Sequence, residues 1–157
     1  MIVVVAPGQG SQTPGFLAPW LAVPSVAEQV AAHSEAVGID LAAHGTESDA
    51  DTIRDTAVAQ PLIVSAGLVS LAALLEGGGR DRIAGIAGHS VGEITAAAGA
   101  GVLSESDALV FVRERARAMA SAAAVVVGGL ETELVQARQE RLLVAAEDGA
   151  HGGGPRG

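Results

Sequence analysis

The stretch that decides the fold is residues 83–100, which read IAGIAGHSVGEITAAAGA. Its first six residues form a short apolar run, which is typical of a buried strand. Its second half is rich in small residues that a helix tolerates. His89 and Ser90 therefore fall at a strand-to-helix turn. Gly88 and Gly92 flank that turn in the Gly-x-Ser-x-Gly pattern of a nucleophile elbow, where glycines let strand and helix approach closely. The pattern predicts a serine nucleophile, with a structural glycine turn as the alternative.

A serine nucleophile needs a base to take its proton and at least two N–H donors for the oxyanion that forms. The N–H of Val91 follows the serine at the start of the predicted helix, where the helix dipole favours negative charge. A second donor is expected from the loop over 7–12, Pro-Gly-Gln-Gly-Ser-Gln, which leaves a neighbouring apolar run over 2–6. The loop lacks the Gly-Lys-Ser/Thr of a P-loop and the glycine spacing of a dinucleotide fingerprint. We therefore expect an oxyanion loop rather than a phosphate cradle.

Hydrophobic periodicity and breaker residues predict an α/β chain with a short parallel sheet. Capping-box spacing joins Ser25 to Glu28 and Ser104 to Asp107, and both pairs predict helix starts. The predicted segments are strands over 2–6 and 83–88, helices over 25–38, 57–76, 91–100 and 104–122, a possible strand over 125–127, helical spacing over 130–146, and a disordered tail over 149–157.

Two residues outside the elbow are singled out by their surroundings. Arg115 lies four residues from both Phe111 and Met119 and shares their apolar stripe, where an unpaired guanidinium would be costly. We expect it to have an anionic partner, for which a carboxylate held by two hydrogen bonds is the natural choice. Gln60 directly precedes Pro61 at the start of a long apolar segment, and its local spacing is equally that of a simple turn residue.

Composition excludes several classes of function. The chain has 157 residues, a net charge of −9 and only 2% aromatic residues, which argues against nucleic-acid binding. It has no cysteine, which excludes disulfides and thiolate metal sites and is compatible with the cytoplasm, and its four histidines lack the spacing of metal ligands. The apolar run over 61–75 is shorter than the roughly 20 residues of a membrane-spanning helix, so no membrane partner is expected.

Four motifs taken together resemble the malonyl-CoA:acyl-carrier-protein transacylases in order and spacing. They are the loop over 7–12, the tripeptide Ala-Gln-Pro over 59–61, the elbow with the glutamate after it over 88–93, and Arg115. The resemblance covers roughly residues 1–124. It implies part of an α/β-hydrolase-like large domain, whose C-terminal part and small ferredoxin-like subdomain are missing from this sequence.

The resemblance also implies a reaction and its residues. Malonyl would pass from malonyl-CoA to Ser90 and then to the phosphopantetheine thiol of an acyl carrier protein, in fatty acid or polyketide synthesis, without a metal or nucleotide cofactor. Gln9 and Val91 would supply the oxyanion-hole N–H groups, and a valine after the serine is typical of malonyl-selective members. Beside the substrate the resemblance places Arg115, Gln60 and His89, with Arg115 gripping the malonyl carboxylate.

The departures from the family limit what we expect of this chain. Residues 1–124 are expected to be the N-terminal part of the large domain, residues 125–148 a remnant of the small subdomain or an unrelated helix, and residues 149–157 a tail. The family's histidine base matches none of His33, His44, His89 and His151, so activity is expected to be impaired. A non-catalytic fragment is the main alternative, and an esterase of the α/β-hydrolase type is the other.

Overall fold

The computed structural model describes residues 2–126. The chain divides into two compact units, Met1–Ala120 and Ser121–Gly157. All the contacts below belong to the first unit, and so do all the elements apart from the last six residues of a helix over 105–126. Of the second, residues 121–126 are described and are helical.

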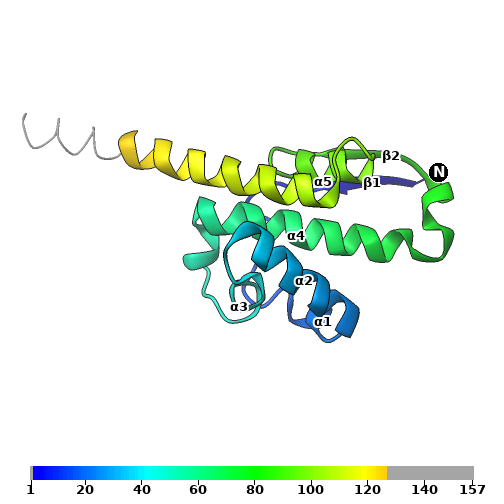
Figure 1. The fold of residues 1–157 in the computed structure, drawn as a ribbon, viewed down its shortest axis with the longest axis horizontal. Coiled ribbons are helices and arrows are strands. Elements are labelled where there is room, and N and C mark those ends of the chain that lie inside the picture. Colours follow the sequence, from blue (N-terminus) through cyan, green and yellow to red (C-terminus); the bar gives the residue numbers. More distant parts are fainter. Residues whose placement is uncertain (1, 127–157) are drawn as a thin grey trace, which may run out of the picture. The chain divides into compact units, whose positions relative to one another are not determined.

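The first unit is a mixed α/β structure in which helices accompany a short parallel sheet (Figure 1). The elements in order are β1 (Ile2–Ala6), α1 (Ala18–Leu21), α2 (Pro24–Val37), α3 (Leu41–Thr46), the 3-10 turn η1 (Thr52–Arg54), α4 (Thr56–Leu75), η2 (Glu76–Arg82), β2 (Ile83–Gly88) and α5 (Gly92–Gly99). A further helix over 105–126 follows α5. β1 pairs with β2 in parallel, with Ala6 opposite Gly88 at the carboxyl end. The predicted α/β class with a short parallel sheet is confirmed.

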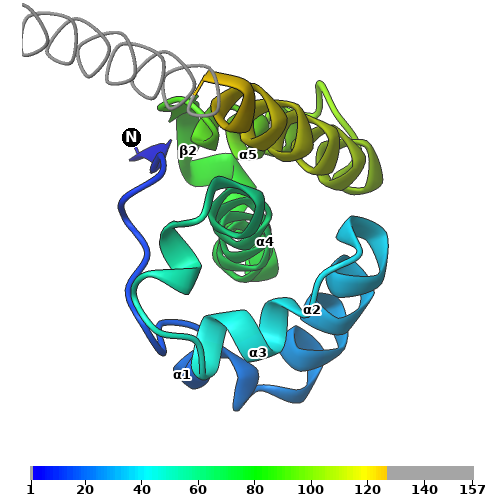
Figure 2. The same cartoon turned by 90° about the vertical axis from the view of Figure 1, so that its left-hand side faces the viewer.

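Helix α4 forms the centre of the core. Figure 2 shows it with α5 on one side and α2 and α3 on the other. Leu62 and Val64 are fully buried, and Gln60 and Ser65 are the polar side chains that the helix buries. With 20 residues α4 is longer than the apolar run over 61–75 and is long and apolar enough to cross a membrane by length and composition, as the core helix of a globular unit can be. Its apolar side chains instead pack against the helices of its own unit.

The helix starts that the capping spacing predicted have different outcomes. Helix α2 begins at Pro24 after Val23, and no side chain caps it, so the predicted capping box of Ser25 and Glu28 is wrong. Proline suits this first position because its fixed φ matches the helix and its missing N–H is not needed there. For the later helix the signal is confirmed, because Ser104 Oγ accepts from the Asp107 N–H at 3.0 Å and donates to its carboxylate at 2.6 Å.

The end of α2 was predicted correctly, whereas two short helices were not predicted. Gly38 ends α2 with φ 77°, as predicted, since a left-handed residue at this point favours glycine. The four-residue α1 and six-residue α3 were not predicted, although Asp40 caps α3 by accepting from the Ala43 N–H at 2.9 Å.

The C-terminal predictions are tested only as far as residue 126. The helix after Ser104 runs to 126 rather than 122, so the possible strand over 125–127 is wrong at its first two residues. The predicted helical segment over 130–146 and the tail over 149–157 lie outside the described residues. The domain boundary at 124 stays a prediction.

Candidate active site

Ser90 lies on a sharp turn between β2 and α5, as the elbow pattern predicts. Its φ is +54°, and it is the one non-glycine residue with positive φ in the part of the chain that the structure describes. An L-residue in this conformation costs about 1–2 kcal/mol, so the surrounding contacts must hold the turn in place. The turn leaves Ser90 exposed, with α5 beginning two residues later.

Both glycines of the elbow are required by close approach. A Cβ on Gly88 would overlap the backbone of Gly92 and Glu93, and a Cβ on Gly92 would overlap the carbonyl oxygens of Ala6 and Pro7. The strand that enters the turn, the helix that leaves it and the end of β1 therefore meet at backbone distance. This contact explains why the pattern needs glycine at these two positions, and it argues against an arbitrary glycine turn.

The loop over 7–12 lies directly against the elbow. A Cβ on Gly8 would come within 2.7 Å of His89 Nδ1 and 2.9 Å of the His89 carbonyl oxygen. The His89 N–H also donates to the Ala6 carbonyl at 3.1 Å, which extends the strand pairing up to the serine. His89 is exposed, and its ring is held next to Ser90 by this backbone geometry rather than by a side-chain hydrogen bond of the described residues.

Side chains fix the loop in a way that the sequence did not reveal. Gln9 Nε2 donates to the Arg54 carbonyl at 3.1 Å, and Gln12 donates to the Ile53 carbonyl at 2.7 Å while accepting from the Gly10 N–H at 2.9 Å. Gln12 is thus a loop-positioning residue that we did not predict. A polar side chain within a glycine-rich loop was the available signal.

Two backbone N–H groups near the elbow are free to bind an oxyanion. Across residues 2–126, no hydrogen bond is made by the N–H of Gln9 or by the N–H of Val91. The Val91 side chain is fully buried in the core, so this residue presents its backbone rather than its side chain. The Val91 N–H lies at the N-terminus of α5, where a free donor stabilises developing negative charge, and the Gln9 N–H lies in the loop that packs against His89.

Arg115 and Gln60 are brought together by the fold. Arg115 Nη1 donates to Gln60 Oε1 at 2.5 Å, and Gln60 Nε2 approaches Met119 Sδ at 3.2 Å. Gln60 is 1% exposed, which excludes the interpretation as a simple turn residue. The amide oxygen neutralises no charge, so the guanidinium keeps both its positive charge and further donors for an anion.

The described residues bear on two expectations about Arg115. No salt bridge of the described part of the chain involves Arg115, so none of these carboxylates is its partner, and the expected anionic partner stays a prediction. The apolar stripe is also only partly buried, because Val112 is fully buried whereas Phe111 is 55% exposed. Helical spacing shows which residues share a face but cannot show what covers that face.

None of the described histidines other than His89 lies at the elbow. His33 is buried between Ser65 and Glu105, with ring distances of 2.8 and 2.6 Å, and His44 lies 3.0 Å from Ser48 Oγ. His151 lies outside the described residues. No cluster that could hold a metal ion occurs between residues 2 and 126.

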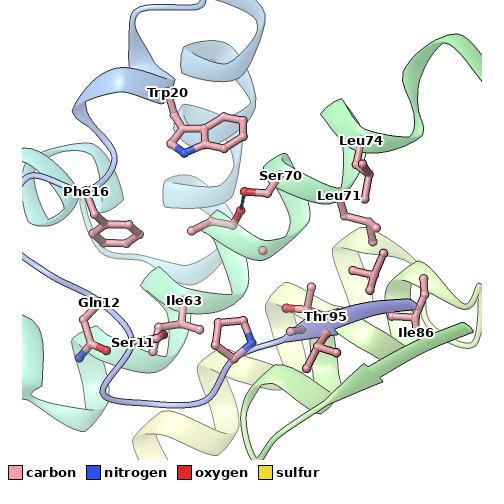
Figure 3. A pocket seen from close by; sticks show the side chains of 16 residues that line it. Ser11, Gln12, Phe16, Trp20, Ile63, Ser70, Leu71, Leu74, Ile86 and Thr95 are labelled. Atoms are coloured by element: carbon pink, nitrogen blue, oxygen red, sulfur yellow. Dashed lines mark hydrogen bonds between the residues drawn. The ribbon is translucent and has the colours of Figure 1, made fainter. Parts of the chain in front are cut away.

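A cavity of about 280 Å³ is lined by Ser11 and Gln12 of the oxyanion loop, and Ser90 is not among its lining residues (Figure 3). It is bounded by β1, by α4 and by Phe16 and Trp20, and its lining is mainly apolar. Thr95 Oγ1 faces it and is buried without a hydrogen-bond partner among the described residues. The cavity shares the oxyanion loop with the candidate site, but Ser90, Arg115 and Gln60 do not line it.

Comparison with protein families identifies the family of this chain. The family model described as "Acyl transferase domain" matches residues 3–150, which is most of the chain. The chain belongs to the acyl transferase domain family. The match extends past residue 124, further than the motifs that carry the resemblance.

Curated relatives of this acyl transferase domain carry a common name. A protein of Mycobacterium tuberculosis (strain ATCC 25618 / H37Rv) named malonyl CoA-acyl carrier protein transacylase is 47% identical over 162 residues, which cover 97% of this chain and 53% of the relative. A protein of Escherichia coli (strain K12) with the same name is 34% identical over 149 residues, covering 94% and 48%. The chain spans about half the length of the curated relatives it matches.

Solved structures show the same acyl transferase fold. The crystal structure of MCAT from Mycobacterium tuberculosis matches with a TM-score of 0.70 and 48% identity, over 80% of this chain and 42% of that one. A malonyl-transacylase in complex with its type II PKS acyl-carrier protein matches with a TM-score of 0.70 and 34% identity, over 76% and 39%.

Proposed function

We propose that this chain performs the acyl-enzyme chemistry of a malonyl-CoA:acyl-carrier-protein transacylase, with Ser90 as the nucleophile. The observation that carries the proposal is the strained, exposed Ser90 at φ +54° beside two unused backbone N–H groups. Strain at a non-glycine residue persists where function needs the side chain in that position. The names of the relatives support malonyl-CoA as donor and an acyl carrier protein as acceptor.

In the proposed reaction Ser90 Oγ attacks the thioester carbonyl of malonyl-CoA. The N–H groups of Gln9 and Val91 stabilise the oxyanion, the carbon–sulfur bond breaks, and the coenzyme A thiolate leaves with the proton lost by the serine. The phosphopantetheine thiol of the carrier protein then attacks the malonyl ester, the bond between the acyl carbon and Ser90 Oγ breaks, and the serine takes up the proton that the thiol loses. Serine and thioester supply the nucleophile and the leaving group, so the proposal includes no metal or nucleotide cofactor.

Arg115 is the proposed specificity residue. Its guanidinium carries a positive charge that no described carboxylate neutralises, and the buried Gln60 fixes its direction. A free carboxylate on the acyl group would complete its hydrogen bonds, which an acetyl group cannot do. An esterase has no use for such a group, so the Arg115–Gln60 pair favours acyl transfer of malonyl. We propose that His89 lines the same site from the elbow.

The proposed mechanism needs a general base for the Ser90 proton. Among the described residues no histidine bonds to Ser90, since His33 and His44 bond to other side chains. We therefore propose that residues 2–126 by themselves support only slow acylation of Ser90. We also propose a cytoplasmic location. For the fold, we propose that residues 1–124 are part of an α/β-hydrolase-like large domain. Residues 125–148 would then be a remnant of the ferredoxin-like small subdomain or an unrelated helix.

The test is the intact mass of the protein before and after incubation with malonyl-CoA. A malonyl increment on the wild type and none on Ser90→Ala would establish Ser90 as the nucleophile. An unmodified wild type would favour the alternative of a non-catalytic fragment.

Replacing Arg115 by alanine separates malonyl transfer from esterase chemistry. Hydrogen bonds to charged groups contribute about 1.5–3 kcal/mol, so Arg115→Ala should slow malonyl acylation about 10- to 100-fold. Acylation by acetyl-CoA, which has no carboxylate, should change little. Equal losses with both donors would contradict the proposed role of Arg115, and Arg117→Ala, an exposed arginine on the same helix, is the matched control.

A further inference from the structure

A network of hydrogen bonds, buried at His33 and Ser65 and exposed at Glu105, joins three helices. His33 on α2 is 2% exposed, and its Nδ1 lies 2.8 Å from Ser65 Oγ on α4. Its Nε2 lies 2.6 Å from Oε1 of Glu105, the first residue of the helix over 105–126. Gln29, one turn before His33, donates to the same carboxylate oxygen at 3.0 Å.

The partners determine where the ring hydrogen lies. A carboxylate only accepts hydrogen bonds, so Nε2 of His33 must carry a hydrogen and donate it to Glu105. Burial would raise the pKa of Glu105, but the hydrogen bonds from Gln29 and His33 and the electrostatic attraction to the His33 ring outweigh it and lower that pKa. Glu105 is therefore ionised at neutral pH, and its bond to the histidine is charge-assisted.

Ser65, His33 and Glu105 are the residue types of a hydrolase triad, but these three side chains cannot act as one. Ser65 is 0% exposed, so no substrate reaches its hydroxyl. The serine lies on Nδ1 and the carboxylate on Nε2, which reverses the arrangement of a serine protease triad. The group must therefore act by holding elements together.

The elements that His33 holds together are those that carry the proposed specificity pair. Ser65 lies on the same helix as Gln60, and Glu105 lies on the same helix as Arg115, about 15 Å further along. Along that helix Arg113 also donates to the Ala36 carbonyl of α2 at 2.9 Å. Any sliding or rotation of the helix over 105–126 that breaks the His33 contact would also move Arg115 relative to Gln60.

We propose that His33 is a positioning residue for malonyl selectivity: its bonds to Ser65 and Glu105 fix the register of the Arg115 helix against α4. The inference rests on the proposed function, in which Arg115 binds the malonyl carboxylate. His33 touches no substrate and no reacting atom, and it acts only through Arg115 and Gln60.

The test compares acylation of Ser90 by malonyl-CoA and by acetyl-CoA, both measured by intact mass in single-turnover reactions. His33→Leu removes both hydrogen bonds and should lower the malonyl-to-acetyl rate ratio about five- to tenfold, within the range of couplings between networked residues. His33→Gln keeps a donor for Glu105 and an acceptor for Ser65 and should restore most of the ratio. The matched control is His44→Leu, which replaces a histidine of α3 that bonds to Ser48. This substitution should not change the ratio.

The double variant His33→Leu with Arg115→Ala tests whether His33 acts through Arg115. If His33 acts through Arg115, adding His33→Leu to Arg115→Ala should lower the ratio no further. Equal falls of both rates with an unchanged ratio, or a full extra loss in the double variant, would overturn the proposal. Should His33→Leu fail to fold, Ser65→Ala removes only one of the two bonds and should lower the ratio in the same direction.

A second measurement does not depend on activity. The side-chain amide of Gln60 gives its own nitrogen–proton NMR signals, which should shift in Arg115→Ala and in His33→Leu but not in His44→Leu. Lack of acylation in the wild type would contradict the proposed function, and the NMR comparison would still decide the role of His33. Gln60 signals that stay unchanged in His33→Leu would overturn the inference.

Discussion

The two halves of the candidate site are built in different ways. The Ser90 elbow is held by backbone: two glycines, a left-handed serine and the ends of two paired strands meet without room for a side chain. The arginine half is held by side chains from distant parts of the sequence, since Arg115 meets Gln60 across 55 residues and His33 meets Glu105 across 72. One half can be found by a short pattern, and the other only by the fold.

The difference has a physical basis. A backbone turn needs particular residues at fixed neighbouring positions, because only glycine fits where another backbone approaches within overlap distance. A side-chain contact between helices can be made by many residue types at many positions. The elbow should therefore be intolerant of small changes, whereas the arginine half should lose function gradually.

The largest effect is expected at Gly92. A Cβ there would overlap the Ala6 and Pro7 carbonyl oxygens, and because backbone cannot move aside cheaply, Gly92→Ala should lower the free energy of unfolding by about 3 kcal/mol. Gly85→Ala is the control, since a Cβ there meets nothing within 4 Å and should stabilise the strand by about 0.5 kcal/mol. Urea unfolding of both variants measures the difference. Similar stabilities would mean that the elbow is not held by backbone contact.

A smaller effect is expected from the left-handed serine itself. Glycine relieves the strain at position 90, so Ser90→Gly should be about 1 kcal/mol more stable than Ser90→Ala. Inside α4, Ser70→Gly should instead be about 1 kcal/mol less stable than Ser70→Ala, because glycine is unfavourable within a helix. Thermal unfolding of the four variants tests this, and the same order at both sites would contradict strain at Ser90.

The smallest effect concerns the charge that supports the arginine half. The lowered pKa of Glu105 means that its ionised form stabilises the fold at neutral pH and that this contribution is lost as the pH falls through that pKa. Glu105→Gln should therefore be destabilised by about 0.5 kcal/mol at pH 7, discounted for partial exposure, with the difference disappearing in acid. Urea unfolding from pH 7 to 3 measures it.

The control for this pH dependence is Glu35→Gln, which changes an exposed carboxylate on the same helix as His33. Its difference from the wild type should remain small across the range. A Glu105→Gln difference that grows as the pH falls would contradict a stabilising role for the ionised carboxylate.

Part of the fold followed from local sequence signals. The apolar runs gave β1 and β2, the apolar segment gave α4, and the hydroxyl of Ser104 marked the start of the last described helix. The short α1 and α3 were missed because four to six residues are too few for a helical period to appear. Ser25 was misread as a cap because Pro24 had already set the first turn.

The candidate site was predicted unevenly. Ser90, its glycines and the loop with Gln9 follow from residues that are close in sequence, and the structure places the loop against His89. Arg115 was identified as needing an anionic partner, and the structure adds a neighbour that the sequence did not reveal, the buried amide of Gln60. The position of Gln12 in a glycine-rich loop was a weak signal, and His33 gave none that distinguished it from an ordinary helix residue.

The sequence by itself determined the nucleophile turn, because the local pattern places a serine between two glycines, and Gly88 is required by backbone only four and five residues further on. The tertiary structure decided which polar side chains meet: the buried Gln60 with the half-buried Arg115, and the buried His33 with Ser65 and the exposed Glu105. Buried polar groups must find partners, but the identity of a partner depends on how the helices pack, which no local pattern encodes.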